Sequence, residues 1–181
     1  IRDSHDGEGY AEVAHIVERH GLHTICSSGK CPNKSECWSR KTATFMILGD
    51  ICTRGCKFCA TPTGRPLPIE PNEPERVAES IKLMGLRHAV ITSVDRDDLP
   101  DAGADHWRRV VEAIRTINPN TTIEVLLPDF DGRRDLIELA LSSRPDIVGH
   151  NLETVERITP LVRSRAKYHT SLQSLRIMAE S

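Results

Sequence analysis

Short apolar runs alternate with stretches of helical periodicity from residue 45 to the end of the chain. The predicted strands are residues 45–48, 89–94, 123–127 and 146–149. The predicted helices are residues 72–85, a segment around 107–114, a segment through 136–140, and residues 155–162 and 172–178. Continuous apolar runs are typical of parallel strands that are buried on both faces. The alternation therefore predicts an α/β fold with right-handed crossovers.

Periodicity alone leaves two parallel architectures open, a barrel and a flat doubly wound sheet. In both, the functional site gathers at the carboxyl ends of the strands. Four groups of polar residues follow predicted strands and should meet there: residues 52–59, 92–95, 128–129 and 150–151.

The first forty residues have a different character. Residues 10–20 predict a short helix that Gly21 ends, and residues 22–36 are polar and interrupted by cysteines. We expect that loop to be ordered by something bound to the cysteines. Asn72 and Glu75 predict a capping box for the helix that follows. The expected division is residues 1–41, an N-terminal helix and cysteine loop, and residues 42–181, the α/β core.

Composition narrows the range of functions. The chain has 181 residues, 38% of them hydrophobic and 28% charged, and a net charge of −2. This gives no polybasic field for nucleic acid or an anionic membrane, and no apolar run approaches the roughly 20 residues of a membrane span. We expect a cytoplasmic protein. The chain starts at Ile1 and stops within a helical pattern, so we also expect it to be cut at both ends.

All six cysteines lie within one short segment: Cys26, Cys31, Cys37, Cys52, Cys56 and Cys59. Such clustering favours metal binding over a disulfide framework, which would spread its bridges over the whole domain.

The later three cysteines have C-x3-C-x2-C spacing. Three thiolates on one tight loop can hold three irons of a [4Fe–4S] cluster and leave the fourth iron open. A zinc loop completed by a distant histidine is the alternative. The earlier three have C-x4-C-x5-C spacing and predict a second cluster, with structural zinc or an electron relay as alternatives.

The later motif, with Phe58 before its last cysteine, resembles the signature of the radical S-adenosylmethionine (SAM) superfamily. Together with the earlier cysteines, the chain from about residue 12 onward resembles lipoyl synthases. The supporting segments are residues 21–24, 31–33, 42–49, 64–66, 92–99 and 150–153.

This resemblance implies a partial (βα)6 barrel with about four parallel strands, two [4Fe–4S] clusters and SAM. The open iron would bind SAM and generate a radical, and the cluster on Cys26, Cys31 and Cys37 would donate sulfur. Two sulfur atoms would be inserted at carbons 6 and 8 of a protein-bound octanoyl-lysine. The implied partners are octanoylated carrier domains (2-oxoacid dehydrogenase E2 subunits and the glycine cleavage H protein) and an electron donor such as ferredoxin or flavodoxin.

The SAM-binding candidates are Phe58, Ser93, Asp95 and Asn151. Each has a simpler alternative: core packing for Phe58, a solvated turn for Ser93 and Asp95, and for Asn151 the capping of a helix that begins near Glu153.

The resemblance is incomplete. The Arg-Ser-Ser-Tyr motif whose serine binds the second cluster in lipoyl synthases is missing, and so is the glycine-rich later strand. We therefore expect an unfinished barrel, inactive by itself, with Ile147 and Val148 exposed. The rival interpretations are another sulfur-inserting radical SAM enzyme, as in biotin formation, and a non-catalytic iron–sulfur electron carrier or zinc module.

Overall fold

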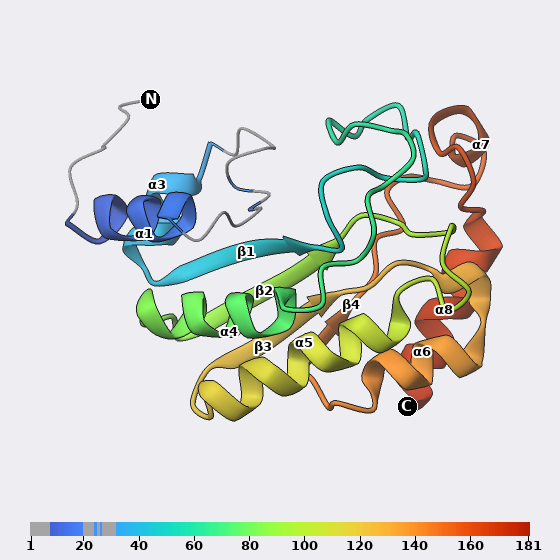
Figure 1. Cartoon of the computed structure of the whole chain (residues 1–181). Coiled ribbons are helices and arrows are strands. Elements are labelled where there is room, and N and C mark those ends of the chain that lie inside the picture. Colours follow the sequence, from blue (N-terminus) through green and yellow to red (C-terminus); the bar gives the residue numbers. More distant parts are fainter. Residues whose placement is uncertain (1–7, 20–23, 25, 27–31) are drawn as a thin grey trace.

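The computed structural model describes residues 8–19, 24, 26 and 32–181, and its centre is one parallel sheet (Figure 1). The strands are β1 (Thr42–Ile47), β2 (His88–Ser93), β3 (Thr122–Leu126) and β4 (Ile147–Gly149). They lie in the order β1-β2-β3-β4, so each strand pairs with the next one along the chain. A doubly wound sheet would reverse its strand order partway. The α/β prediction is confirmed, and the winding is that of a partial barrel.

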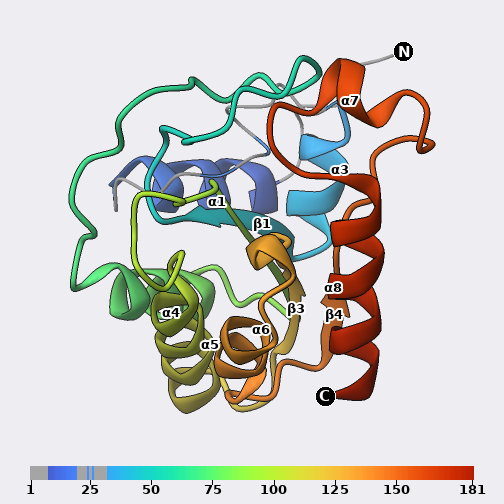
Figure 2. The same cartoon turned by 90° about the vertical axis from the view of Figure 1, so that its right-hand side faces the viewer.

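The helices lie mainly on one face of the sheet (Figure 2). They are α1 (Glu8–Arg19), α3 (Lys34–Ser39), α4 (Glu73–Leu83), α5 (Ala104–Ile117), α6 (Arg134–Leu141), α7 (Thr159–Val162) and α8 (Tyr168–Glu180), with a 3-10 turn, η1 (Phe130–Gly132). Helix α5 packs against α4 and α6, and α8 packs against α6 and η1. Within the described residues, no helix is both long enough and apolar enough to cross a membrane.

The core lies between the sheet and these helices. Alternate strand residues such as Phe45, Ile91 and Val125 are at most 1% exposed, and they face helix residues such as Trp107 and Val111, which are fully buried. Burial of each large apolar side chain contributes roughly 1.5–3 kcal/mol. Helix α5 is amphipathic along its whole length for this reason.

The opposite, inner face of the sheet is more polar. Thr44, Thr92 and Glu124 are all partly exposed on this face. Near the amino ends of the strands, His88 Nε2 lies 2.9 Å from Glu124 Oε2. Leu126 lies on the same face near the carboxyl ends, so the polarity of this face changes along the strands.

Two expected elements differ in the structure. Residues 155–162 do not form one helix, because Pro160 has no N–H to bond one turn back, and only α7 is helical. The expected strand 45–48 ends at Ile47, because Leu48 has a left-handed φ of 68°. The capping box is also wrong: Asn72 is the N-cap of α4, but its side chain makes no capping hydrogen bond.

The N-terminal part contains a helix that periodicity missed. Helix α3 lies within and just after the stretch expected to be a loop, and it carries Cys37. It packs beside β1, and its Trp38 is 1% exposed. A helix of six residues depends on such packing, because short helices are marginal in water. Residue 20 and Cys31 lie outside the described residues.

Strand β4 forms one side of the described sheet. Within the described chain its neighbour is β3 alone, and Ile147 and Val148 are 45% and 37% exposed. The expected exposure of these two side chains is confirmed.

Gly103 gives a test of how closely this fold is packed. It caps α5 with a φ of 83°, and a Cβ there would lie 2.7 Å from Leu48 Cδ1. Gly103→Ala should lower the free energy of unfolding by about 2–4 kcal/mol, from left-handed strain plus overpacking. Chemical denaturation measures the loss. Gly85→Ala is the matched control, because Gly85 has a φ of 57° and no atom within 4 Å of its virtual Cβ. Equal losses in the two variants would show that the contact with Leu48 costs nothing.

Candidate functional site

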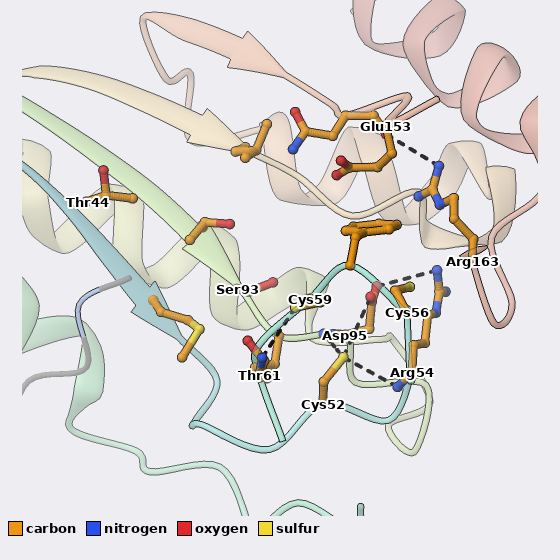
Figure 3. A pocket seen from close by; sticks show the side chains of 16 residues that line it. Thr44, Cys52, Arg54, Cys56, Cys59, Thr61, Ser93, Asp95, Glu153 and Arg163 are labelled. Atoms are coloured by element: carbon orange, nitrogen blue, oxygen red, sulfur yellow. Dashed lines mark hydrogen bonds and ion pairs between the residues drawn. The ribbon is translucent and has the colours of Figure 1, made fainter. Parts of the chain in front are cut away.

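A pocket of about 310 Å³ opens at the carboxyl ends of the strands (Figure 3). Its walls come from β1, β2 and β3, the loop after β1 and the segment after β4. The lining residues are Thr44, Met46, Cys52, Arg54, Cys56, Phe58, Cys59, Thr61, Thr92, Ser93, Val94, Asp95, Leu126, Asn151, Glu153 and Arg163. The pocket therefore brings together seven residues that the sequence singled out: three cysteines and the four SAM-binding candidates.

Backbone hydrogen bonds close the cysteine loop. Cys52 N–H donates to the Pro62 carbonyl at 2.9 Å, and Gly64 N–H donates to the Cys52 carbonyl at 3.0 Å. These bonds hold the two ends of the loop together and leave Cys56 and Cys59 on its outer turn. Lys57 N–H donates to the Val162 carbonyl at 2.8 Å, so the turn is also fixed to α7.

The three thiols fit an iron–sulfur cluster chemically. Cys52 Sγ accepts backbone N–H groups from Arg54 and Asp95, both at 3.3 Å, and Cys59 Sγ accepts one from Thr61 at 3.5 Å. Such donors stabilise a thiolate and tune a cluster. Burial still raises the pKa of Cys52 above its usual value. Within the described residues, no three metal-binding side chains converge on a single-ion site. In a cluster, each thiolate binds a different iron.

Arg54 belongs to this loop, and its side chain is the buried cation of the site. Its side chain is 4% exposed and donates from Nε and Nη2 to both oxygens of Asp97, at 2.8 and 2.7 Å. Its Nη1 donates to Asp129 Oδ1 at 2.9 Å. Asp95 and Asp131 lie at 3.5 and 3.7 Å. One guanidinium thus joins the loop to the segments that follow β2 and β3.

The carboxylates around Arg54 differ in their acidity. Burial raises the pKa of Asp95 to about 6, although the Arg54 charge opposes this shift. Burial alone would also raise the pKa of Asp97, but hydrogen bonds from Arg54 and Thr53 outweigh it and hold the pKa below its usual value. The carboxylates likewise raise the pKa of Arg54, against the effect of burial.

The segment after β4 forms the far wall of the pocket. Arg163 donates from Nη1 to Ser171 Oγ at 3.0 Å and to the Asn151 carbonyl at 3.4 Å. Glu153 lines the same pocket (Figure 3). Burial lowers the pKa of His150, which favours the neutral ring, and its Nδ1 lies 2.8 Å from the Leu127 carbonyl.

Several buried polar atoms at this edge have no hydrogen-bond partner within the described chain. They are Ser93 Oγ, Asp129 Oδ2, His150 Nε2 and Arg163 Nε. Their residues line a second hollow of about 130 Å³, which shares part of its wall with the first. Because an unpaired buried polar group is costly, this arrangement suits a polar ligand or ordered water.

Left-handed residues other than glycine also mark this edge. Leu48, Phe130, Asp131 and Glu153 have φ values of 68°, 46°, 52° and 66°. They follow β1, β3 and β4. Each costs about 1–2 kcal/mol, and such strain is frequent at functional sites.

The structure bears on the simpler alternatives for the SAM-binding candidates, and their role in SAM binding stays a prediction. Phe58 is 51% exposed and does not belong to the core. The turn after β2 is only partly solvated: Arg96 is 3% exposed and donates to the carbonyls of Leu48 and Leu67, whereas Asp98 is exposed and forms a local ion pair with Arg96. No helix begins near Glu153, so Asn151 caps none.

The sequence did not single out Arg54, Asp129, Glu153 or Arg163 as site residues. Arg54 lies inside the cysteine motif, but the partners of its side chain are 43 and 75 residues away in sequence. Arg163 belongs to a basic stretch that looks like solvated surface. Two signals are usable: Asp129 belongs to a group expected at the carboxyl edge, and Glu153 belongs to the segment 150–153 that resembles lipoyl synthases.

Of the earlier cysteines, Cys37 lies apart from this pocket. Helix α3, which carries Cys37, lies beside β1 near its amino end, whereas the Cys52 loop follows the carboxyl end (Figure 1). Cys26 is buried and Cys37 is partly exposed. Cys31 lies outside the described residues.

Comparisons with known proteins agree on one family. The model of the radical SAM superfamily matches residues 46–181. Proteins named lipoyl synthase from Bacteroides fragilis (strain YCH46), Parabacteroides distasonis and Treponema denticola are 64%, 62% and 54% identical, over 96%, 96% and 97% of this chain. The chain spans 60–62% of the length of these relatives. The crystal structure of methylornithine synthase (PylB) has a TM-score of 0.60 at 10% identity, over 94% of this chain and 52% of that one. This likeness supports the fold alone.

The acidity of Asp97 gives a testable pH dependence. A lowered pKa means that its stabilising effect is present above the unfolded value of about 3.9 and is lost as the pH falls through the folded value. Asp97→Asn should cost about 2 kcal/mol of unfolding free energy at pH 7, the scale of a hydrogen bond to a charged group. Denaturation at pH 7 and pH 3 should show this difference shrink at the lower pH. A difference that is equal at both pH values would mean that the carboxylate charge is not what stabilises the loop.

Proposed function

The chain belongs to the radical SAM superfamily, and from this premise we propose that it works as a lipoyl synthase, inserting two sulfur atoms at carbons 6 and 8 of a protein-bound octanoyl-lysine. The observation that carries the proposal is the pocket at the carboxyl ends of the strands, which gathers Cys52, Cys56 and Cys59 with the polar groups around them. A second set of three cysteines in the sequence, Cys26, Cys31 and Cys37, supports it. The identity of 54–64% to proteins named lipoyl synthase supports it.

In this proposal Cys52, Cys56 and Cys59 would hold a [4Fe–4S] cluster, and the residues around them would hold SAM beside it. When bound, the cluster and SAM supply the radical that removes hydrogen from an unactivated carbon, and a second cluster supplies the sulfur. The protein positions SAM and limits access of water to it. No side-chain base could remove such hydrogens, because no neighbouring group makes them acidic.

The pocket wall offers complementary groups for SAM. The amino and carboxylate groups of SAM need charged or hydrogen-bonding partners, and Asp95 and Arg163 line the pocket with opposite charges. Ser93 and Asn151 add neutral polar groups, and the exposed ring of Phe58 offers an apolar surface at the edge. We assign these residues to SAM binding together with Glu153.

We assign residues 1–41 to the second cluster, held by Cys26, Cys31 and Cys37, and residues 42–181 to the radical SAM core. The carrier would be an octanoylated lipoyl domain of a 2-oxoacid dehydrogenase or the glycine cleavage H protein, with ferredoxin or flavodoxin as the electron donor. We place the reaction in the cytoplasm. The net charge of −2 is compatible with a protein partner rather than nucleic acid.

Metal content tests this proposal directly. Anaerobic reconstitution of the chain should give about eight irons and eight sulfides, four of each per cluster. Adding SAM should change the absorption or paramagnetic resonance spectrum. About one zinc per set of cysteines, without sulfide, would overturn the proposal.

The two sets can be separated by substitution. Replacing Cys52, Cys56 and Cys59 with Ala together should halve the iron to about four and abolish the spectral response to SAM, since each cluster holds four irons. Replacing Cys26, Cys31 and Cys37 should also halve the iron but leave that response intact. If both triple variants respond alike to SAM, the proposed division of roles is wrong.

A further inference from the structure

The cysteine loop is fixed to the sheet through the two residues after Cys52. Thr53 N–H donates to the Asp95 carbonyl at 3.1 Å, and Thr53 Oγ1 lies 3.0 Å from both the Asp95 carbonyl and Asp97 Oδ2. Arg54 then inserts its side chain between Asp97 and Asp129. The outer turn has fewer supports, which include Gly55 N–H to Ser164 Oγ at 3.0 Å. The segment after Cys52 is therefore where the loop is held most firmly.

Arg54 contacts both the sheet and the sulfur. Its guanidinium binds carboxylates that follow two different strands, while its backbone N–H donates to Cys52 Sγ at 3.3 Å. A second N–H, from Asp95, reaches the same sulfur at 3.3 Å. Because side chain and backbone belong to one residue, the ion pairs fix the position of the N–H group and with it the orientation of the thiol.

The chemistry of the side chain is specific. A planar guanidinium can bind Asp97 through two parallel hydrogen bonds and still reach a third carboxylate oxygen, which a lysine ammonium cannot do with the same geometry. A buried ion pair is weak support for stability, because desolvation offsets much of the attraction. An arginine that is 4% exposed between fixed carboxylates is better explained by geometry than by overall stability.

We infer that Arg54 is a positioning residue for the metal-binding loop: its guanidinium clamps the loop to the segments after β2 and β3, and its backbone N–H aims Cys52 Sγ into the pocket. This rests on the proposed function for its biological meaning. The clamp itself involves residues of the metal-free chain alone. It can therefore be tested whether or not the cluster assignment holds.

The test is the reactivity of individual thiols in the metal-free, reduced chain. A maleimide pulse followed by peptide mass spectrometry gives a rate for each cysteine. Cys52 is 8% exposed, whereas Cys59 is exposed and serves as the internal reference. In Arg54→Gln, Cys52 labelling relative to Cys59 should rise about tenfold or more, because losing charged hydrogen bonds favours local opening of the loop.

Three further variants separate positioning from general stability. Arg54→Lys keeps the positive charge but loses the paired hydrogen bonds of the planar guanidinium. The ratio of Cys52 to Cys59 labelling should therefore lie between the wild-type value and that of Arg54→Gln. Asp97→Asn removes one partner, and the ratio should rise less than in Arg54→Gln. Arg108→Gln is the matched control: Arg108 also pairs with two carboxylates, Asp105 and Glu112, but on the surface of α5. Its ratio should stay at the wild-type value.

Two results would overturn the inference. One is an unchanged Cys52-to-Cys59 ratio in Arg54→Gln while thermal unfolding stays cooperative. The other is an equal rise in Arg108→Gln, which would reflect lost stability in general. If Arg54→Gln does not fold, Arg54→Lys and Asp97→Asn decide, and unchanged ratios in both reject the clamp. Iron analysis of reconstituted Arg54→Gln adds a second readout: with Cys26, Cys31 and Cys37 replaced by Ala, its iron per chain should fall well below that of the same triple variant with Arg54 intact.

Discussion

A single buried cation holds the carboxyl edge of this sheet together. Arg54 contacts carboxylates that follow β2 and β3, and its own loop follows β1, so three strand ends converge on one guanidinium. The carboxylates Asp95, Asp97, Asp129 and Asp131 all lie within 4 Å of it. Together with the exposed Arg165, which pairs with Asp97 and Asp131, its positive charge offsets the repulsion among these four carboxylates. The pocket wall, the thiol orientation and the lowered pKa of Asp97 depend on this pairing.

Much of the fold could be predicted from the sequence because its signals are local. Apolar runs such as residues 89–94 indicate strands, and their alternation with helices favours a parallel sheet. The spacing of Cys52, Cys56 and Cys59 is equally local, so the loop and its place at the carboxyl edge could be foreseen. Only the strand order, read from the structure, separates a barrel from a doubly wound sheet.

The rest of the fold and of the site could not be predicted, because it depends on interactions that sequence spacing does not encode. The partners of Arg54 are brought to it by the crossovers between strands, and nothing near residue 54 indicates them. Helix α3 forms because Trp38 is buried, although six residues have little helical tendency by themselves. The helix predicted over residues 155–162 does not form in full, although its periodicity is helical, because Pro160 lacks the N–H that a continuous helix needs there.

The inner face of the sheet differs in polarity between the two ends of its strands. Thr92 at the pocket lies four residue steps along β2 from His88 at the other end, about 13 Å at roughly 3.3 Å per step. Water hydrates the partly exposed His88–Glu124 pair at the far end, and burying the pair would remove that hydration. Met46 and Leu126 near the pocket lose nothing when they are covered. Covering this face therefore costs less beside Met46 and Leu126 than over the His88–Glu124 pair.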